Sequence, residues 1–273
     1  MNYRQKAGES PDSLGLEDLR TLPRPVYGHY LALPNRAISR MHTHSWAQLS
    51  YAVRGVIEVR TQAGRFTAPP LRAVWVPAHT EHGVWCTADA EIRSLYIDVD
   101  ASSDDVSATL GWNHCCVISV GPLLRELIRH FAELPVEYDE EGAEGRLVQV
   151  LIDQLASAPE AALMMLPWPQ DPRLQHVCAL LQQNPQNRKT LAQYSDIVGV
   201  SEKTLSRLFR QQTGLSFRLW RQRSRLFKSL PMLERGDRVT DVALACGYDS
   251  MSAFIAAFRQ QMGVTPGEFL NSD

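Results

Sequence analysis

Three histidines and a glutamine in the first third of the 273-residue chain could carry binding or metal chemistry. His42 and His44 are two residues apart, and Gln48 and His82 follow them. Residues i and i+2 of a strand point to the same face, so His42 and His44 can converge inside a sheet structure. Three imidazoles would suit Zn, Ni, Cu or Fe(II). Three interpretations stay open, namely a divalent-metal site, a small-molecule effector pocket lined by these four residues, and histidines that only make structural hydrogen bonds.

A second group of residues, near the C-terminus, has the layout of a nucleic-acid reader, and it occurs twice. Each copy has a short helix, a turn at a glycine (Gly199 or Gly247) and a capping serine (Ser201 or Ser250), followed by an amphipathic helix. Serine at an N-cap satisfies backbone N–H groups that the helix itself leaves unpaired. Two short helices around a tight turn present the second one outward, where it can enter a major groove about 12 Å wide.

The charge of the chain is unevenly distributed. Residues 1–170 carry 14 Lys and Arg against 21 Asp and Glu, whereas residues 171–273 carry 14 against 9, which gives a balance of +5 at the C-terminal end. A basic half indicates contact with nucleic acid. There is no run of 18 apolar residues and no apolar secretory signal near the N-terminus, so we expect a cytoplasmic protein with no membrane partner.

Short strands must position the histidines. Runs rich in β-branched and aromatic residues alternate with Gly and Pro between Val26 and Val99, a pattern typical of a sandwich or a barrel. The predicted strands are 26–33, 48–54, 56–61, 73–77 and 92–99.

Two amphipathic helices are expected after the strands. Apolar residues recur at helical spacing from Leu123 to Phe131 and from Leu147 to Leu155. Their apolar stripes either pack on the sheet or form a homodimer interface, and the sequence leaves both open. Four prolines between Ala158 and Pro172 oppose helix and predict a linker there. The segment from Phe217 to Leu233 is expected to join the two helix-turn-helix units, with Pro231 kinking it or ending it early.

The C-terminal hundred residues resemble the DNA-binding domain of the AraC/XylS family of transcription regulators. The resemblance covers LAQYSDIVGVSEKTLSRLFRQQTGLSFRLWRQRSRL and VTDVALACGYDSMSAFIAAFRQQMGVTPGEF. The second stretch is the signature region of the family. The residues that match its pattern are Ala243, Gly247, Tyr248, Ser252, Phe254, Phe258, Gly263, Thr265 and Pro266.

The resemblance implies which side chains face DNA. Arg207 is the strongest candidate for a bidentate contact to guanine O6 and N7. The second recognition helix has no arginine before Arg259, so we expect thymine-methyl contacts and backbone positioning there, with docking on phosphates alone as the alternative. The predicted DNA-binding residues are Lys203, Thr204, Ser206, Arg207, Arg210, Met251, Ser252, Ile255, Ala256 and Arg259.

The N-terminal half resembles the cupin-like jelly roll that often precedes this DNA-binding domain. The matching pattern is His42-x-His44-x3-Gln48-x6-Gly55, followed by Pro77 and His82. In metal-binding cupins a glutamate occupies the position of Gln48, and an amide there removes one negative charge from a divalent-metal site.

The expected fold class is α+β in two domains, a cupin-like β-jelly roll with amphipathic helices and an all-α domain with two helix-turn-helix units. The expected boundaries are a flexible N-terminus (1–24), a sensor domain (25–120), a helical dimerisation or transmission segment (121–157), a proline-rich linker (158–170) and the DNA-binding domain (171–273).

The expected function is transcription regulation in response to a small-molecule effector. The expected partners are promoter DNA, RNA polymerase, the effector and a second copy of the chain, and the family resemblance points to an adjacent transporter gene as a target. The rival is a metal-dependent cupin enzyme that uses His42, His44 and His82. That alternative leaves the two helix-turn-helix units unexplained and lacks the carboxylate of the usual oxygenase triad, so we expect no enzyme. No cofactor is certain, and a divalent metal (Zn, Ni, Cu or Fe) is the candidate.

Overall fold

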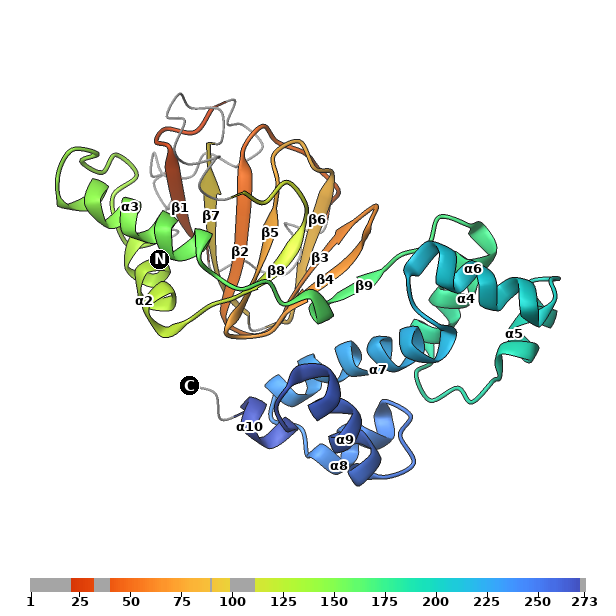
Figure 1. Cartoon of the computed structure of the whole chain (residues 1–273). Helices are drawn as coiled ribbons and strands as arrows, with labels where there is room; N and C mark the ends of the chain where they lie inside the picture. Colours follow the sequence, from red (N-terminus) through yellow and green to blue (C-terminus); the bar gives the residue numbers. More distant parts are fainter. Residues whose placement is uncertain (1–20, 32–39, 89, 99–110, 271–273) are drawn as a thin grey trace, which may run out of the picture.

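The computed structural model describes residues 21–31, 40–88, 90–98 and 111–270. A β-sandwich forms the N-terminal part and a group of helices the C-terminal part (Figure 1). The first sheet is antiparallel with strand order β1-β7-β2-β5-β8. Its strands are β1 (Val26–Leu31), β2 (Ala47–Arg54), β5 (Arg72–Val76), β7 (Glu91–Ile97) and β8 (Cys116–Ser119).

The second sheet is also antiparallel and has the order β6-β3-β4-β9. Its strands are β3 (Ile57–Thr61), β4 (Gly64–Ala68), β6 (His82–Cys86) and β9 (Met165–Pro167). The five strand regions predicted from sequence are confirmed within the described residues. Residues 32, 33 and 99 of those regions lie outside the described chain. Strands β4, β6, β8 and β9 were not predicted, since they are short and several contain Gly, Pro or charged residues that weaken the strand pattern.

Strand β2 is buried on both faces because it lies between two cores. Leu49 and Tyr51 pack in one hydrophobic cluster with residues of helices α2 (Pro122–Phe131) and α3 (Ala143–Ala156). Ala52 belongs to the other cluster, which includes Val59 and Phe66 of the second sheet. Alternation along a strand therefore places Gln48 and Ser50, both buried, on the face between the two sheets.

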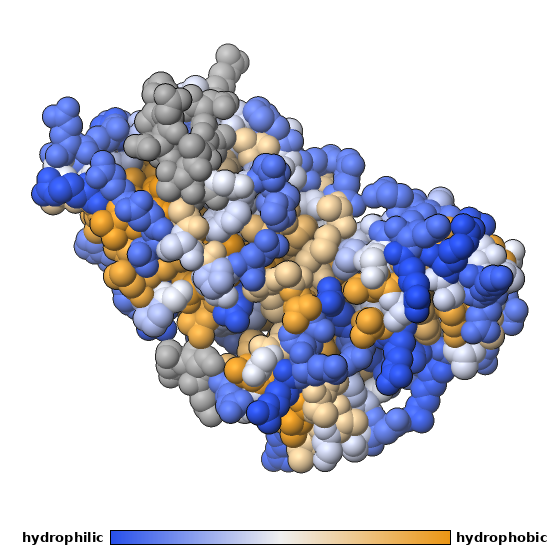
Figure 2. Space-filling view, in the orientation of Figure 1, coloured by the Kyte–Doolittle hydropathy of each residue, from blue (hydrophilic) through white to orange (hydrophobic). Residues whose placement is uncertain are grey.

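The two predicted amphipathic helices are confirmed, and their buried stripes cover the outer face of the first sheet. Leu124, Ile128 and Leu151 pack with Leu49 and Tyr51 of that sheet. Packing on each other and on the sheet therefore accounts for the buried side of both helices. Leu123 and Val150 remain 56% and 44% exposed, and apolar surface is visible over this region in Figure 2.

The proline-rich segment predicted as a linker contains regular structure. Residues 162–164 form a short 3-10 helix, and β9 follows it at once. Met165, Leu166 and Pro167 pair with Phe66, Arg65 and Gly64 of β4. A three-residue strand is too short to give a sequence signal, and its stability comes from this pairing with residues a hundred positions earlier.

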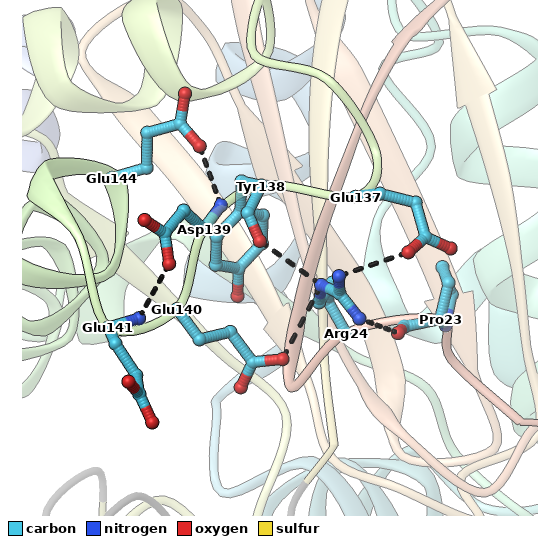
Figure 3. A network of polar contacts seen from close by, with 8 residues as sticks. All are labelled: Pro23, Arg24, Glu137, Tyr138, Asp139, Glu140, Glu141 and Glu144. Atoms are coloured by element: carbon cyan, nitrogen blue, oxygen red, sulfur yellow. Dashed lines mark hydrogen bonds and ion pairs between the residues drawn. The ribbon is translucent and has the colours of Figure 1, made fainter.

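The last residues of the predicted flexible N-terminus are held in place, while residues 1–20 lie outside the described chain. Arg24 donates from Nε to the Tyr138 backbone oxygen (3.2 Å) and forms ion pairs with Glu137 (3.0 Å) and Glu140 (3.4 Å) (Figure 3). The acidic segment between α2 and α3 therefore anchors the chain just before β1.

The C-terminal part is helical throughout, as predicted. Its helices are α4 (Pro172–Gln183), α5 (Leu191–Ile197), α6 (Glu202–Thr213), α7 (Phe217–Glu234), α8 (Val239–Ala245), α9 (Met251–Met262) and α10 (Pro266–Leu270). Within the described residues, no helix is both long enough and apolar enough to cross a membrane.

The two parts are packed against each other. One continuous hydrophobic cluster includes Phe66 and Leu166 of the second sheet together with Trp220 of α7. The Gly55 amide, in the turn between β2 and β3, donates to Glu234 Oε1 at the end of α7 (2.9 Å). The DNA-binding helices therefore rest on the sandwich.

Candidate nucleic-acid interface and imidazole site

The first helix-turn-helix unit consists of α5 and α6, and its ends are fixed by local hydrogen bonds. Thr190 and Gln193 form a reciprocal capping box at the start of α5. Ser201 Oγ accepts from the Thr204 amide (3.1 Å) at the start of α6. Gly214 ends α6 with a φ of +69°, a conformation that glycine adopts without strain. The predicted caps of this unit are confirmed.

Helix α6 has one buried face and one polar face. Leu205 and Phe209 are fully buried, and Phe209 contacts Phe217 and Trp220 of α7. The predicted DNA contacts lie on the other side, where Lys203, Arg207 and Arg210 are exposed and Thr204 and Ser206 are partly exposed. The interior cannot hold three charged side chains, so packing itself aims the cations outward.

The second unit, α8 and α9, repeats the geometry with different surface chemistry. Ser250 Oγ accepts from the Ala253 amide (3.2 Å), and Gly263 ends α9 with a φ of +81°. Helix α8 begins at Val239, with Arg238 in the N-cap position. Phe254 and Phe258 are buried in the core.

The outward side of α9 is mostly apolar. Met251, Ser252, Ala256 and Arg259 are exposed, and Ile255 is partly exposed. A shallow open hollow runs along this face, and Ser252, Ile255, Ala256, Arg259, Gln260 and Thr265 line it. All ten predicted DNA-binding residues are therefore accessible, and each recognition helix presents its own five.

Helix α7 joins the two units and continues through Pro231 to Glu234, so the expected early end does not occur. Three arginines of this helix donate hydrogen bonds to backbone oxygens outside the helix. Arg221 donates to the Lys189 backbone oxygen (3.0 Å), and Arg223 donates to the Met165 backbone oxygen (2.9 Å).

Arg225 is the third structural arginine, and sequence reasoning missed its role. It donates from Nε to the Pro185 oxygen (2.8 Å) and from Nη2 to the Asn187 oxygen (3.2 Å), in the loop before α5. Its guanidinium also lies 6.0 Å from the Tyr248 ring of the second unit. Burial lowers the pKa of Arg225, but a guanidinium stays charged at any physiological pH. The residue therefore connects the two units.

Gly247 completes this connection. Its φ is +79°, and a Cβ atom there would lie 2.5 Å from the Pro185 oxygen. Any other residue would both strain the turn and push away the loop that Arg225 binds. The glycine was predicted for its turn, but its close contact with the other unit gives no signal in the sequence.

The predicted imidazole group also comes together. His42 and His82 are paired by two backbone hydrogen bonds of 2.8 and 2.9 Å, and their ring centroids are 4.4 Å apart. The His44 ring lies 5.0 Å from that of His82. Gln48 Oε1 is 3.1 Å from Nε2 of both His44 and His82. The four residues thus form one cluster at the open edge between the two sheets.

Burial favours the neutral form of two rings in the cluster. Burial is the largest cause of a lowered pKa at both His44 and His82, and it brings the pKa of His82 to about 4. Trp46 stacks on the His44 ring, with centroids 5.1 Å apart. His79, the other histidine nearby, is exposed. At neutral pH His44 and His82 therefore offer neutral imidazoles.

A sandwich with a polar cluster between its sheets, joined to two helix-turn-helix units, defines a two-domain transcription regulator. Residues 25–156 match the AraC-like ligand binding domain, and residues 194–272 match a helix-turn-helix domain. The chain belongs to the AraC/XylS family and is a DNA-binding regulator with a ligand-binding domain.

Relatives of known name agree with this assignment. The chain is 35% identical over 232 residues to the HTH-type transcriptional regulator NimR of Escherichia coli (strain K12), covering 85% of this chain and 82% of NimR. It is 29% identical over 133 residues to the HTH-type transcriptional activator RhaR of Yersinia pestis, covering 45% of this chain and 44% of RhaR. Proteins similar to this chain are thus transcription regulators.

Among solved structures, the C-terminal domain of AraT, a response regulator from Geobacillus stearothermophilus, is 27% identical. The match covers 38% of this chain and 87% of that domain, with a TM-score of 0.36.

Proposed function

We propose that the two recognition helices divide the work of binding a promoter. Helix α6 reads base edges, with Arg207 forming a bidentate contact to guanine, and α9 positions the protein through apolar contacts and Arg259. The observation that carries this proposal is the contrast between the cationic face of α6 and the apolar face of α9. Apolar side chains can contact thymine methyl groups, while bidentate arginine contacts distinguish guanine from the other bases.

The sandwich serves as the sensor in this proposal. Residues 25–120 bind an effector, and residues 121–157 transmit its state or hold two copies together. Residues 171–273 bind DNA. The packed contact between Gly55 and Glu234 supports communication between the two parts, because a change in the turn after β2 reaches the end of α7 directly. An effector acts only if it favours one of two arrangements of these parts.

The protein is not an enzyme in this proposal, and it acts in the cytoplasm on promoter DNA together with RNA polymerase. The names of its relatives support a regulator over a metal-dependent cupin enzyme. We further propose that the target is an adjacent transporter gene. Incubation of the protein with DNA from upstream of the neighbouring genes tests this target, and binding equal to that of scrambled DNA would reject it.

A homodimer through α2 and α3 is the proposed assembly. The exposed Leu123 and Val150 support it, since they are apolar side chains of these two helices that such an interface would bury. Sedimentation of the wild type and of a Leu123→Asp variant measures this directly. A wild type that stays monomeric at micromolar concentration would contradict the dimer and leave the DNA-binding proposal intact.

The decisive experiment is fluorescence-anisotropy binding to the specific duplex and to a scrambled duplex at several salt concentrations. Arg207→Ala should weaken specific binding by about 1–3 kcal/mol and relax preference at one base pair. Arg218→Ala is the matched control, because Arg218 is an exposed arginine on α7, outside both recognition helices. An unchanged ratio of specific to nonspecific affinity in Arg207→Ala would refute the base-reading role.

A further inference from the structure

The three histidines of the sandwich have their ring tautomers fixed by the backbone. His42 Nδ1 lies 3.0 Å from the Arg40 oxygen, His44 Nδ1 2.7 Å from the Trp46 oxygen and His82 Nδ1 2.8 Å from the Thr80 oxygen. A backbone carbonyl can only accept a hydrogen bond, so each Nδ1 carries the hydrogen. It follows that Nε2 of each neutral ring holds a free lone pair.

These lone pairs converge on another acceptor. Gln48 Oε1 is 3.1 Å from Nε2 of His44 and 3.1 Å from Nε2 of His82. The orientation of the Gln48 amide is set on its other side, where Nε2 donates to Ser50 Oγ (2.9 Å). Three electron-rich atoms therefore face one another, an arrangement that is unfavourable unless a cation lies among them.

A metal ion can fill this role. Metal binding needs ring nitrogens that carry no proton, and Nε2 of each of these rings is the nitrogen left without a hydrogen once Nδ1 donates to a backbone oxygen. Backbone carbonyls on the opposite ring nitrogens are also the usual way in which proteins orient metal-binding histidines.

The distances suit a small transition metal. The candidate ligand nitrogens of His42, His44 and His82 all lie within 4.8 Å of one another. Zinc–nitrogen bonds of about 2.0–2.1 Å place the ligands of a tetrahedral site about 3.3 Å apart, which small ring rotations would achieve. Three imidazoles and no carboxylate favour Zn, Cu, Ni or Fe over Mg or Ca, which prefer oxygen ligands.

We propose that the sensor domain binds one divalent transition metal through Nε2 of His42, His44 and His82, with Gln48 Oε1 as a neutral fourth ligand. This inference deepens the proposed sensor role and rests on it for its regulatory meaning. Because all four ligands are neutral, the site keeps the full charge of the ion. Such a site attracts an anionic effector group to the edge of the sandwich.

The test is zinc titration of the chelator-treated full-length protein against a competing chromogenic chelator, with metal content measured in parallel. The titration uses a His114→Gln background, since His114, Cys116 and Glu160 form a second, more exposed group that could hold a metal. We expect one zinc per chain, and His44→Gln or His82→Gln should weaken zinc binding by roughly 100-fold or more, beyond the loss typical for an orienting residue. The matched control is His79→Asn, which should bind zinc like its parent. His79 is exposed and has a φ of 60°, a conformation that asparagine tolerates.

Gln48→Glu distinguishes the metal site from a purely structural network. A carboxylate ligand adds a negative charge, so this variant should bind zinc more tightly than its parent. If the Gln48 amide were instead reversed and donated both hydrogens to the two rings, the variant would unfold more easily and gain no zinc affinity. That result, or a parent protein that binds no zinc, would overturn the proposal. DNA binding of the same preparation is measured separately, so loss of the metal site and loss of the regulator function are told apart.

Discussion

The two helix-turn-helix units share a backbone plan but not a surface. Both recognition helices have 12 residues, begin after a capping serine and end at a left-handed glycine. Aligned from those caps, Arg207 of α6 corresponds to Ala256 of α9, and Lys203 corresponds to Ser252. The buried partner Phe209 corresponds to the equally buried Phe258. The interior of the unit is thus repeated, while the face toward DNA is free to differ.

This difference teaches which residues make the unit and which make its specificity. The two units have capping serines, terminal glycines and buried aromatic residues in common, although their surfaces differ. The predicted DNA-facing side chains that differ between the units are all accessible, so changing them should alter DNA affinity and leave the stability of the fold nearly unchanged.

The largest expected effect is on the free energy of unfolding, and it tests the buried aromatic position that the two units share. Phe209→Ala and Phe258→Ala should each lower the free energy of unfolding by about 3–5 kcal/mol, because each removes a fully buried aromatic ring and leaves a cavity. Urea unfolding followed by circular dichroism measures both losses. If one variant lost less than about 1 kcal/mol, the two interiors would not be equivalent.

A smaller loss is expected when the connection between the units is cut. Arg225→Met keeps the length and apolar stem of the side chain but removes two hydrogen bonds to backbone oxygens. Charged hydrogen bonds contribute about 1.5–3 kcal/mol each, and part of this returns when water solvates the freed oxygens, so we expect a loss of about 2–3 kcal/mol. Thermal unfolding provides the measurement, with Arg218→Met as the exposed control. Equal stability of the two variants would show that Arg225 does not connect the units.

The caps should contribute equally to the two units. Ser201→Ala and Ser250→Ala each remove one hydrogen bond to a helix N-terminal amide, at a cost of about 1 kcal/mol. Chemical denaturation of the two variants compares them directly. Ser201 Oγ also shares a hydrogen bond of 2.9 Å with Thr204 Oγ1, which Ser201→Ala removes as well, so the first loss should be slightly the larger. A difference above 1 kcal/mol in either direction would contradict equivalent caps.

The smallest expected effect is on the salt dependence of DNA binding. It comes from exchanging the side chains at one matched position of the two recognition helices, Lys203 of α6 and Ser252 of α9. Lys203→Ser should make the plot of log K against log salt less steep by about 0.9 if Lys203 contacts a phosphate, and Ser252→Lys should make it steeper by the same amount. Anisotropy titrations at four salt concentrations yield both slopes. Two unchanged slopes would mean that this position lies away from the phosphates in both helices.

The sequence predicted features that depend on neighbouring residues better than features that depend on distant ones. Caps and glycines mark α6 and α9 locally, and the His-x-His spacing places two rings on one face, so these parts were predictable. The pairing of β9 with β4 joins residues about a hundred positions apart, and the contact of Arg225 with Pro185 spans forty. A lone arginine in a basic run does not reveal that its partners are carbonyl oxygens. The acceptor role of Gln48 likewise depends on ring orientations that only the folded chain defines.

The contact of Arg225 with the loop before α5 has a consequence for the DNA itself. With α7, a helix of 18 residues or about 27 Å, it keeps α6 and α9 at one separation and one rotation. Two rigidly linked helices can only meet grooves that return to the same side of the duplex after about 10 base pairs. Five extra base pairs between their contact points would turn one groove to the far side, so promoters of this regulator should tolerate changes of sequence there better than changes of length.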